Sequence, residues 1–130
     1  MMDLELIGKV AIITGGSDGL GRATAKRFAL EGAKVVICAR REEYLLNSAR
    51  DLCEETDGNV IGIKADVSSS NDCSNLIDET VRRLGRVDIL VNNAGSSLSK
   101  ALDELNDESW YQDLDLKLMA AVRMSRGVIP

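Results

Sequence analysis

Short apolar segments typical of β-strands alternate with helical segments along the whole chain. The strand-like segments carry apolar side chains at consecutive positions, so both of their faces must be buried. Alternation of this kind, with right-handed crossovers, predicts an α/β fold in which a doubly wound, Rossmann-like parallel sheet is built from four βα units. An antiparallel α+β domain would leave one face of these strands in water. The expected strands are Val10–Thr14, Lys34–Cys38, Val60–Lys64 and Val87–Asn92.

Each expected helix has an apolar stripe at helical spacing, which indicates the face that packs on the sheet. Gly32 is well placed to end the first helix, and the Asp66–Ser70 turn offers several N-caps for the third. The stripe of the last helix is interpreted as either core or subunit interface. The helices and their stripes are Gly19–Glu31 with Leu20, Ala23, Phe28 and Ala29; Arg41–Glu55 with Leu45, Ala49 and Leu52; a helix ending at Leu84 with Cys73, Ile77, Val81 and Leu84; and Glu108–Ile129 with Leu114, Leu118 and Val122.

Composition excludes several classes of function. The 130 residues form one expected domain that can bury a core without metals or disulfides. A formal net charge of -5 argues against nucleic-acid binding, which needs a basic surface. No apolar run reaches the roughly 20 residues that span a bilayer, and the N-terminus lacks the layout of a signal peptide, so we expect a cytoplasmic protein without a membrane partner. There is no histidine, and the three cysteines form no C-x-x-C pair, so we expect no metal site.

Glycines gather directly after the first expected strand, with the spacing Gly15-x-x-x-Gly19-x-Gly21. The spacing differs from the G-x-G-x-x-G dinucleotide pattern, and the lysine of a P-loop is missing. The physical reasons for such glycines still hold: one allows a sharp turn, and others allow the backbone to approach a ligand closely. Amides near Leu20 would then point from a helix N-terminus at an anion such as a pyrophosphate. The alternative is a glycine-rich turn that binds nothing.

Three motifs, each at the carboxyl end of an expected strand, together resemble the short-chain dehydrogenase/reductase family. The resemblance extends from about Leu6 to Pro130 and implies a Rossmann-like fold that binds a nicotinamide cofactor. The motifs are Thr14-Gly15 with Gly19-Leu20-Gly21 after the first strand, Asp66-Val67 after the third, and Asn92-Asn93-Ala94-Gly95 after the fourth.

The resemblance implies a role for each motif. Thr14 would hold the glycine turn, and Asp66 with Val67 would line the adenine pocket, where the carboxylate would accept a hydrogen bond from the adenine amino group. The segment Asn93-Ala94-Gly95 would let the backbone pass close to the nicotinamide ribose. Asn92 is interpreted as a structural residue that ties neighbouring strands together.

The residues after the second strand favour NADP(H) over NAD(H). Cofactor sites for NAD place an acidic residue there to bind the ribose 2′-hydroxyl, whereas this chain has Arg40 and Arg41. A guanidinium fork suits a phosphate and cannot accept a hydrogen bond from a hydroxyl. Ser17 is a further candidate donor to phosphate, while the carboxylate of Asp18 would oppose an anion nearby. The alternative is that both arginines are solvated charges at the start of the next helix.

The catalytic Y-x-x-x-K of the family is not found, so no catalytic residue can be assigned. Tyr44 and Tyr111 are followed four residues later by Ser48 and Asp115. Lys117 stands where the resemblance implies a helix asparagine. We therefore expect residues 1–130 to be an NADP(H)-binding Rossmann-like domain, truncated before the catalytic half and inactive by itself.

The function expected for the full protein is hydride transfer between NADP(H) and a small-molecule carbonyl or alcohol substrate. By resemblance, the full-length protein would be a homo-oligomer, either a dimer or a tetramer. Two alternatives stay open from the residues alone. One is a non-catalytic nucleotide-binding module that ends at residue 130. The other is a methyltransferase, although those enzymes need an acid where Arg40 stands.

Overall fold

The computed structural model of the chain describes residues 4–93 and 106–129. Strands and helices alternate as expected, and the first three βα units have bounds within a residue or so of the predicted ones. The elements are β1 Val10–Thr14, α1 Gly19–Leu30, β2 Lys34–Ala39, α2 Glu42–Thr56, β3 Asn59–Lys64, α3 Ser70–Leu84, β4 Ile89–Val91, α4 Asp107–Leu114, the π-helical segment η2 Asp115–Met119, and α5 Ala120–Val128.

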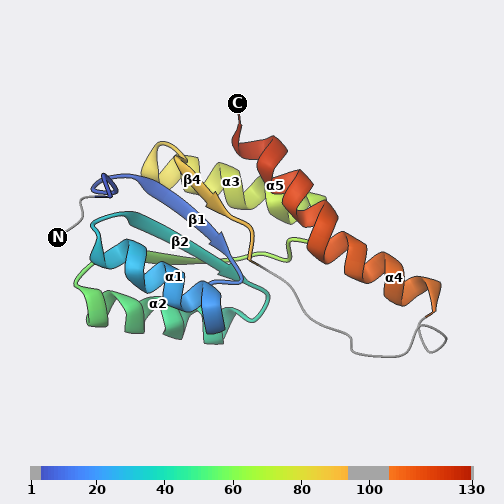
Figure 1. Ribbon diagram of the computed structural model, residues 1–130, viewed down its shortest axis with the longest axis horizontal. Coiled ribbons are helices and arrows are strands. Elements are labelled where there is room, and N and C mark those ends of the chain that lie inside the picture. The colour runs from blue at the N-terminus through green and yellow to red at the C-terminus, as the bar shows by residue number, and fades with distance from the viewer. Residues whose placement is uncertain (1–3, 94–105, 130) are drawn as a thin grey trace.

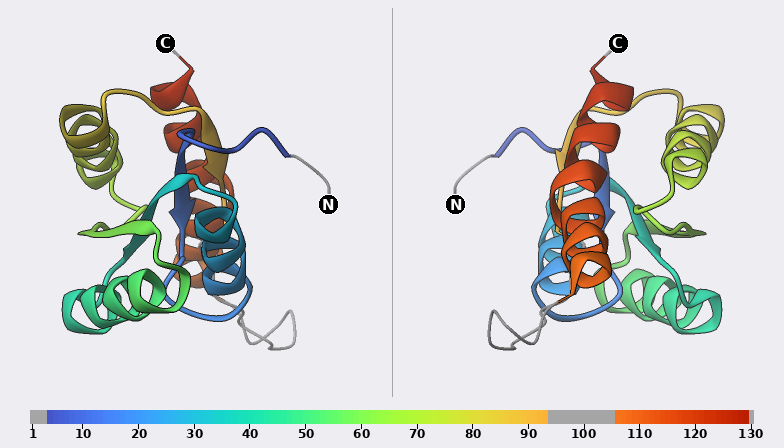
Figure 2. Two further views of the ribbon diagram at one scale, coloured as in Figure 1. Left: turned by 90° about the vertical axis from the view of Figure 1, so that its left-hand side faces the viewer. Right: turned by 90° about the vertical axis from the view of Figure 1, so that its right-hand side faces the viewer.

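The four strands form one parallel sheet in the order β3-β2-β1-β4. Helices α1 and α2 cover one face of the sheet, and α3 and α5 cover the other (Figures 1 and 2). The chain winds outward from β1 to β3 and then crosses back to place β4 on the other side of β1. The doubly wound, Rossmann-like fold expected from the sequence is therefore confirmed. Sheets of this kind bind ligands beyond the carboxyl ends of the strands, where the winding reverses.

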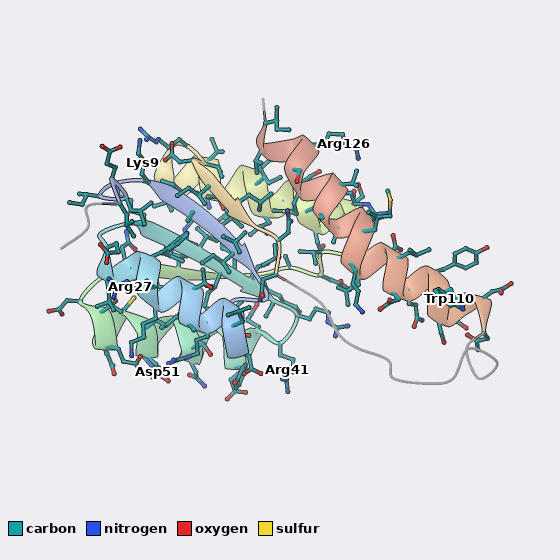
Figure 3. The ribbon with its side chains drawn as sticks, in the orientation of Figure 1. Lys9, Arg27, Arg41, Asp51, Trp110 and Arg126 are labelled. Carbon is teal, nitrogen blue, oxygen red and sulfur yellow. The ribbon has the colours of Figure 1, made fainter. Side chains whose placement is uncertain are left out.

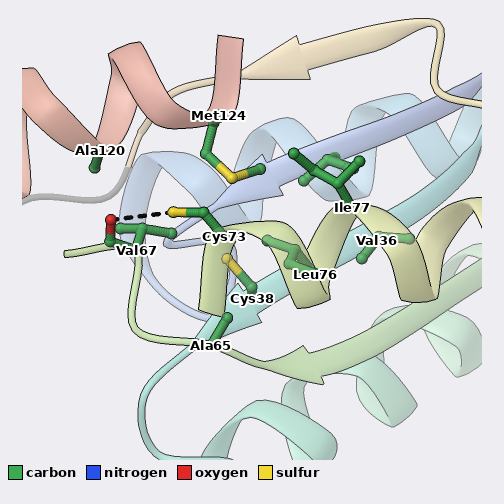
Figure 4. Close-up of a cluster of buried hydrophobic side chains, with 10 residues drawn as sticks. Val36, Cys38, Ala65, Val67, Cys73, Leu76, Ile77, Ala120 and Met124 are labelled. Atoms are coloured by element: carbon green, nitrogen blue, oxygen red, sulfur yellow. Dashed lines mark hydrogen bonds between the residues drawn. The ribbon is translucent and has the colours of Figure 1, made fainter. Parts of the chain in front are cut away.

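Side chains of the two central strands alternate between the two layers of core, as the period of an extended chain requires. On β2, Val36 and Cys38 face the layer that α3 and α5 complete with Leu76 and Met124 (Figure 4). Ile37 faces the opposite layer, with α1 and α2. Both faces of these strands are buried, so the antiparallel alternative does not apply.

The buried face of α1 differs from the predicted stripe. It consists of the small residues Gly21, Ala25 and Ala29, whereas Leu20 is 77% exposed and Ala23 is also exposed. Small residues let the helix axis approach the sheet closely, and a larger side chain on this face would hold it away. The predicted stripe is therefore right at Ala29 and at Phe28, which packs against the same core, but wrong at Leu20 and Ala23, because it weighted hydrophobicity and not size.

The apolar stripe predicted for α3 is wrong at one position, Val81. Cys73 and Ile77 are buried as expected, but Val81 is exposed and the next buried position is Thr80. The Thr80 hydroxyl donates to the Leu76 carbonyl at 2.8 Å, which satisfies this polar group inside the core. Among the expected N-caps of this helix, the residue used is Ser69, whose hydroxyl accepts from the Asp72 amide.

The fourth strand is shorter than predicted and the last helix is interrupted. Strand β4 covers only Ile89–Val91, because Asp88 caps the start of β1 by accepting from the Val10 amide at 2.8 Å. The single helix expected over Glu108–Ile129 is instead α4, η2 and α5 in succession. Its stripe of Leu114, Leu118 and Val122 is exposed, so it is not core among the described residues. Within residues 4–93 and 106–129, every helix is too short or too polar to serve as a bilayer span.

Leu45 and Leu46 on α2 provide a matched test of the predicted core. Leu45 is fully buried and packs over Gly62 of β3, whereas Leu46 is 49% exposed. We expect Leu45→Ala to lower the free energy of unfolding by about 2–5 kcal/mol, because it leaves a cavity, and Leu46→Ala to lower it by about 0.5 kcal/mol or less. Urea denaturation of both variants measures the difference. Equal losses would contradict the placement of α2.

Candidate functional site

A pocket of ≈680 Å³ opens at the carboxyl ends of the strands. Segments far apart in the sequence meet there: the end of β2, the loops after β1, β2 and β3, the second residue after β4, and one residue of η2. Figure 3 shows Arg41 at the end of α2 that faces this edge of the sheet. The residues that line the pocket are Gly15, Ser17, Asp18, Gly19, Cys38, Ala39, Arg40, Arg41, Tyr44, Ala65, Asp66, Val67, Asn93 and Leu116.

The glycine turn after β1 has the backbone conformations that the sequence predicts. Gly15 and Gly19 both adopt positive φ angles, +67° and +54°, which other residues rarely tolerate. The Gly15 amide donates to the Cys38 carbonyl at 3.0 Å and fixes the turn to β2. Asp18 is the N-cap of α1 but its side chain makes no capping hydrogen bond, so the first amides of α1 lack a capping partner from it. Such amides can bind an anion.

Asn93 ties the end of β4 to the glycine turn. Its backbone amide donates to Thr14 Oγ1 at 2.9 Å, and its side-chain amide donates to the Gly15 carbonyl at 3.2 Å. A Cβ on Gly21 would lie 2.3 Å from Asn93 Nδ2 and 2.4 Å from the Gly15 oxygen, so only glycine fits there. Thr14 and Gly21 therefore hold the turn together behind the pocket and do not line it.

Three other predicted residues, Ser17, Leu20 and Asn92, differ in where they lie relative to the pocket. Ser17 lines the pocket but is buried, and its carbonyl accepts from the Ser48 hydroxyl of α2 at 3.0 Å. Leu20 does not line the pocket, and its side chain is exposed on the first turn of α1. The strand-tying role expected of Asn92 belongs to Asn93, because the Asn92 side chain reaches Ser125 on α5 instead.

Arg40 and Arg41 line the pocket where β2 passes into α2. Both are exposed, and neither forms an ion pair with another residue of the described ranges. Arg41 is the N-cap of α2, where a cation opposes the helix dipole, and Glu42 and Glu43 in the first turn offset this. The Arg41 guanidinium carbon lies 5.2 Å from the centre of the Tyr44 ring. Two unpaired guanidinium groups therefore face the same pocket.

Asp66, shortly after β3, is held as a carboxylate in the same pocket. Its Oδ1 accepts from the Ser68 hydroxyl at 2.6 Å and from the Ser68 amide at 3.0 Å. The Ser68 hydroxyl makes the largest contribution to lowering the pKa of Asp66, and the positive charge of Arg40 lowers it further. Arg123 of α5 donates to the Ser68 carbonyl at 2.9 Å and anchors this loop. The carboxylate is thus available as a hydrogen-bond acceptor at neutral pH.

Five lining residues were not predicted. Cys38 and Ala39 are the last two residues of β2, and Ala65 directly follows β3, so the position of the strand ends was a signal that could have found them. Tyr44 and Leu116 had no such signal, because they come from a helix turn and from η2. Burial raises the pKa of the Cys38 thiol to about 12, so Cys38 contributes a neutral wall.

Three further predicted positions are not among the described residues that line the pocket. Ala94 and Gly95 lie outside the described residues. Lys117 does not line the pocket, although its neighbour Leu116 does, and its ammonium pairs with Asp113 at 3.1 Å. The structure therefore assigns Lys117 an ion pair along the helix.

Comparison with known proteins favours one of the open alternatives. The family model described as short chain dehydrogenase matches residues 9–130. The chain belongs to this family. Membership favours the oxidoreductase interpretation over a methyltransferase and over a non-catalytic nucleotide-binding module.

The chain spans about half of the length of the relatives named below, or less, and their names describe oxidoreductases. It is 39% identical over 129 residues to an uncharacterized oxidoreductase of Bacillus subtilis, covering 99% of this chain and 48% of that protein. It is 38% identical over 127 residues to 11-beta-hydroxysteroid dehydrogenase A of Sesamum indicum, covering 97% and 36%. The crystal structure of L-sorbose reductase from Gluconobacter frateurii, complexed with NADPH and L-sorbose, superposes with a TM-score of 0.95 at 40% identity, covering 99% and 49%.

The packing at Gly21 predicts a sharp effect of one methyl group. We expect Gly21→Ala to lower the free energy of unfolding by about 1–3 kcal/mol, because the new Cβ overlaps backbone and cannot be accommodated by a side-chain rotation. Ala23→Ser, on the exposed face of the same helix, should change it by about 0.5 kcal/mol or less. Thermal unfolding of both variants tests this, and an unaffected Gly21→Ala protein would contradict the close contact with Asn93.

Ser68→Ala should raise the pKa of Asp66 toward the ordinary aspartate value, because it removes the hydroxyl with the largest effect on that carboxylate. A depressed pKa adds stability that is present above the unfolded-state pKa of about 3.9 and is lost as pH falls through the folded-state pKa. The difference in the free energy of unfolding between wild type and variant should therefore be largest at neutral pH and should vanish in stronger acid. Carboxyl NMR titration of both proteins measures the shift; an unchanged pKa refutes the assignment.

Proposed function

We propose that this chain forms the NADP(H)-binding part of an oxidoreductase that transfers hydride between the cofactor and a small-molecule carbonyl or alcohol. The observation that carries the proposal is the pair of unpaired guanidinium groups, Arg40 and Arg41, facing the pocket that also contains the glycine turn. A phosphate group suits such a pair, because each guanidinium offers parallel N–H donors. Arg40 and Arg41 would hold the 2′-phosphate that distinguishes NADP(H) from NAD(H).

The rest of the pocket fits a dinucleotide of this kind. The first amides of α1, beside Gly19, suit the pyrophosphate, and Gly21 lets this end of α1 pack closely on Gly15 and Asn93 behind the pocket. The Asp66 carboxylate, kept charged by Ser68, would accept from the adenine amino group. Asn93 would border the nicotinamide ribose from the end of β4. The solved relative that contains NADPH supports this use of the fold.

The division of chemistry follows from these residues. When bound, the nicotinamide supplies or accepts the hydride. The residues of this chain bind and orient the cofactor, with Arg40 and Arg41 at one end of the pocket and Asn93 toward the other. We propose that the intact protein works as a homo-oligomer, dimer or tetramer. Leu114, Leu118 and Val122 support this, because they leave an apolar stripe exposed along α4, η2 and α5.

Arg40→Gln tests the assignment of the cofactor. Loss of a charged hydrogen bond to phosphate should weaken NADPH binding by about ten- to a hundredfold. NADH binding should stay within about a factor of two, since NADH has no 2′-phosphate. Calorimetric titration of the intact protein with each cofactor measures both. Equal affinity of the wild-type protein for NADPH and NADH would contradict the proposal.

Arg50→Gln is the matched control, because Arg50 is an exposed arginine of α2 that does not line the pocket. Its variant should bind NADPH as the wild type does. Hydride transfer is tested with NADPH deuterated at the nicotinamide C4 and a panel of small ketones. Deuterium on the carbinol carbon of a product supports the oxidoreductase function. Tight NADPH binding without any such transfer would favour a cofactor-binding role alone.

A further inference from the structure

Among the described residues that line the pocket, Tyr44 is the one aromatic residue, and it lies against an arginine. It stands three residues after Arg41, the N-cap residue of α2, and lies on the first turn of that helix. The guanidinium carbon of Arg41 lies 5.2 Å from the ring centre, within the range of a cation–π contact. Both side chains are exposed at the rim, where water would otherwise leave a long side chain free to move.

The two arginines of the pocket stand in different surroundings. Arg40 acts electrostatically on the carboxylate of Asp66 across the pocket, so part of its positive charge is already offset. Arg41 has two carboxylates next to it in sequence, Glu42 and Glu43, yet it pairs with neither. Its described neighbour is instead the face of Tyr44, which attracts the cation without neutralising its charge.

A neutral aromatic partner has a consequence that a carboxylate would not have. An ion pair would occupy the guanidinium donors, and a phosphate would then have to displace it. A cation–π contact with a ring involves no carboxylate acceptor, so it leaves the guanidinium N–H groups available to donate to a phosphate. It also restricts the rotamers of a flexible side chain before the ligand arrives, which reduces the entropy lost on binding.

We propose that Tyr44 is a positioning residue that holds Arg41 ready for the 2′-phosphate of the cofactor, and so contributes to the choice of NADP(H) over NAD(H). Arg41 is then the second phosphate-binding group of the pocket, beside Arg40. This inference rests on the proposed function, because it names the selectivity of the same pocket. It assigns that selectivity in part to a residue that itself makes no bond to the phosphate.

The test compares two small probes that differ only in the 2′-phosphate, 2′,5′-ADP and 5′-AMP. Their dissociation constants are measured by calorimetry on the intact protein and on Tyr44→Leu and Tyr44→Phe. Loss of an exposed cation–π contact should weaken 2′,5′-ADP binding to Tyr44→Leu by about two- to fivefold. Binding of 5′-AMP should not change. Tyr44→Phe keeps the ring and should bind both probes as the wild type does.

Tyr111→Leu is the matched control, because Tyr111 is an exposed tyrosine of α4 that does not line the pocket. It should leave both dissociation constants unchanged. Equal weakening of both probes by Tyr44→Leu would mean that Tyr44 contacts the adenosine and would overturn the inference. So would a loss in Tyr44→Phe as large as in Tyr44→Leu, because the hydroxyl would then be responsible.

The two proposals fail in different ways. If the wild-type protein prefers 2′,5′-ADP and Tyr44→Leu keeps the full preference, the role of Tyr44 is refuted while the cofactor assignment stands. If the wild-type protein binds the two probes equally, or binds neither, the NADP(H) assignment fails and the role of Tyr44 fails with it.

Discussion

Three segments of the chain meet in a close contact at the end of β1, and the shape of the pocket depends on this contact. The Gly15 carbonyl, the Gly21 backbone and the Asn93 side chain occupy a space that has no room for one more carbon atom. This contact fixes the start of α1 relative to β4, and the Asn93 amide on Thr14 Oγ1 extends it to the end of β1. Since β1 and β4 lie on either side of the point where the winding reverses, the same contact sets the floor of the crevice.

The loops around that crevice are held mainly by hydrogen bonds from helices behind them. Ser48 of α2 donates to the Ser17 carbonyl, and Arg123 of α5 donates to the Ser68 carbonyl. Each bond fixes a loop backbone and leaves the groups that face the pocket available. The arginines at the start of α2 follow the same rule, because no carboxylate of the described residues pairs with them. The structure thus separates the groups that hold the pocket from those that can hold a ligand.

The sequence predicted the sheet and the lining of the pocket well, for physical reasons. Consecutive apolar residues mark a strand buried on both faces, and the carboxyl ends of parallel strands must meet at one edge. Gly15, Arg40 and Asp66 could therefore be assigned to one site from their positions alone. Ser48 and Arg123 could not, because their partners are backbone carbonyls of other segments and no pattern of side chains encodes such a bond.

The predictions from the sequence were wrong where side-chain size or tertiary contacts override the periodicity of the apolar residues. On α1, the close approach to Gly15 selects small residues, so the hydrophobic Leu20 lies outside the contact. Asp88 lies within the predicted strand, but its carboxylate accepts from the Val10 amide. The pairing of β4 with β1 therefore begins one residue later, at Ile89. In the last helix, the apolar residues form a continuous stripe in the sequence, but the backbone forms a π-helical turn at η2. Leu116, in this turn, lies at the pocket.

The chemistry of the lining residues explains why binding and proton transfer would be divided in such a protein. A carbonyl that receives hydride also needs a proton, from a group whose pKa lies near the working pH. Cys38 is the thiol of the pocket, and burial raises its pKa to about 12, which makes it too weak an acid. Asp66 has the opposite problem, since Ser68 and Arg40 keep it ionised and it can only accept. The surroundings that make Cys38 and Asp66 suitable walls for a cofactor therefore prevent both of them from acting as the acid at neutral pH.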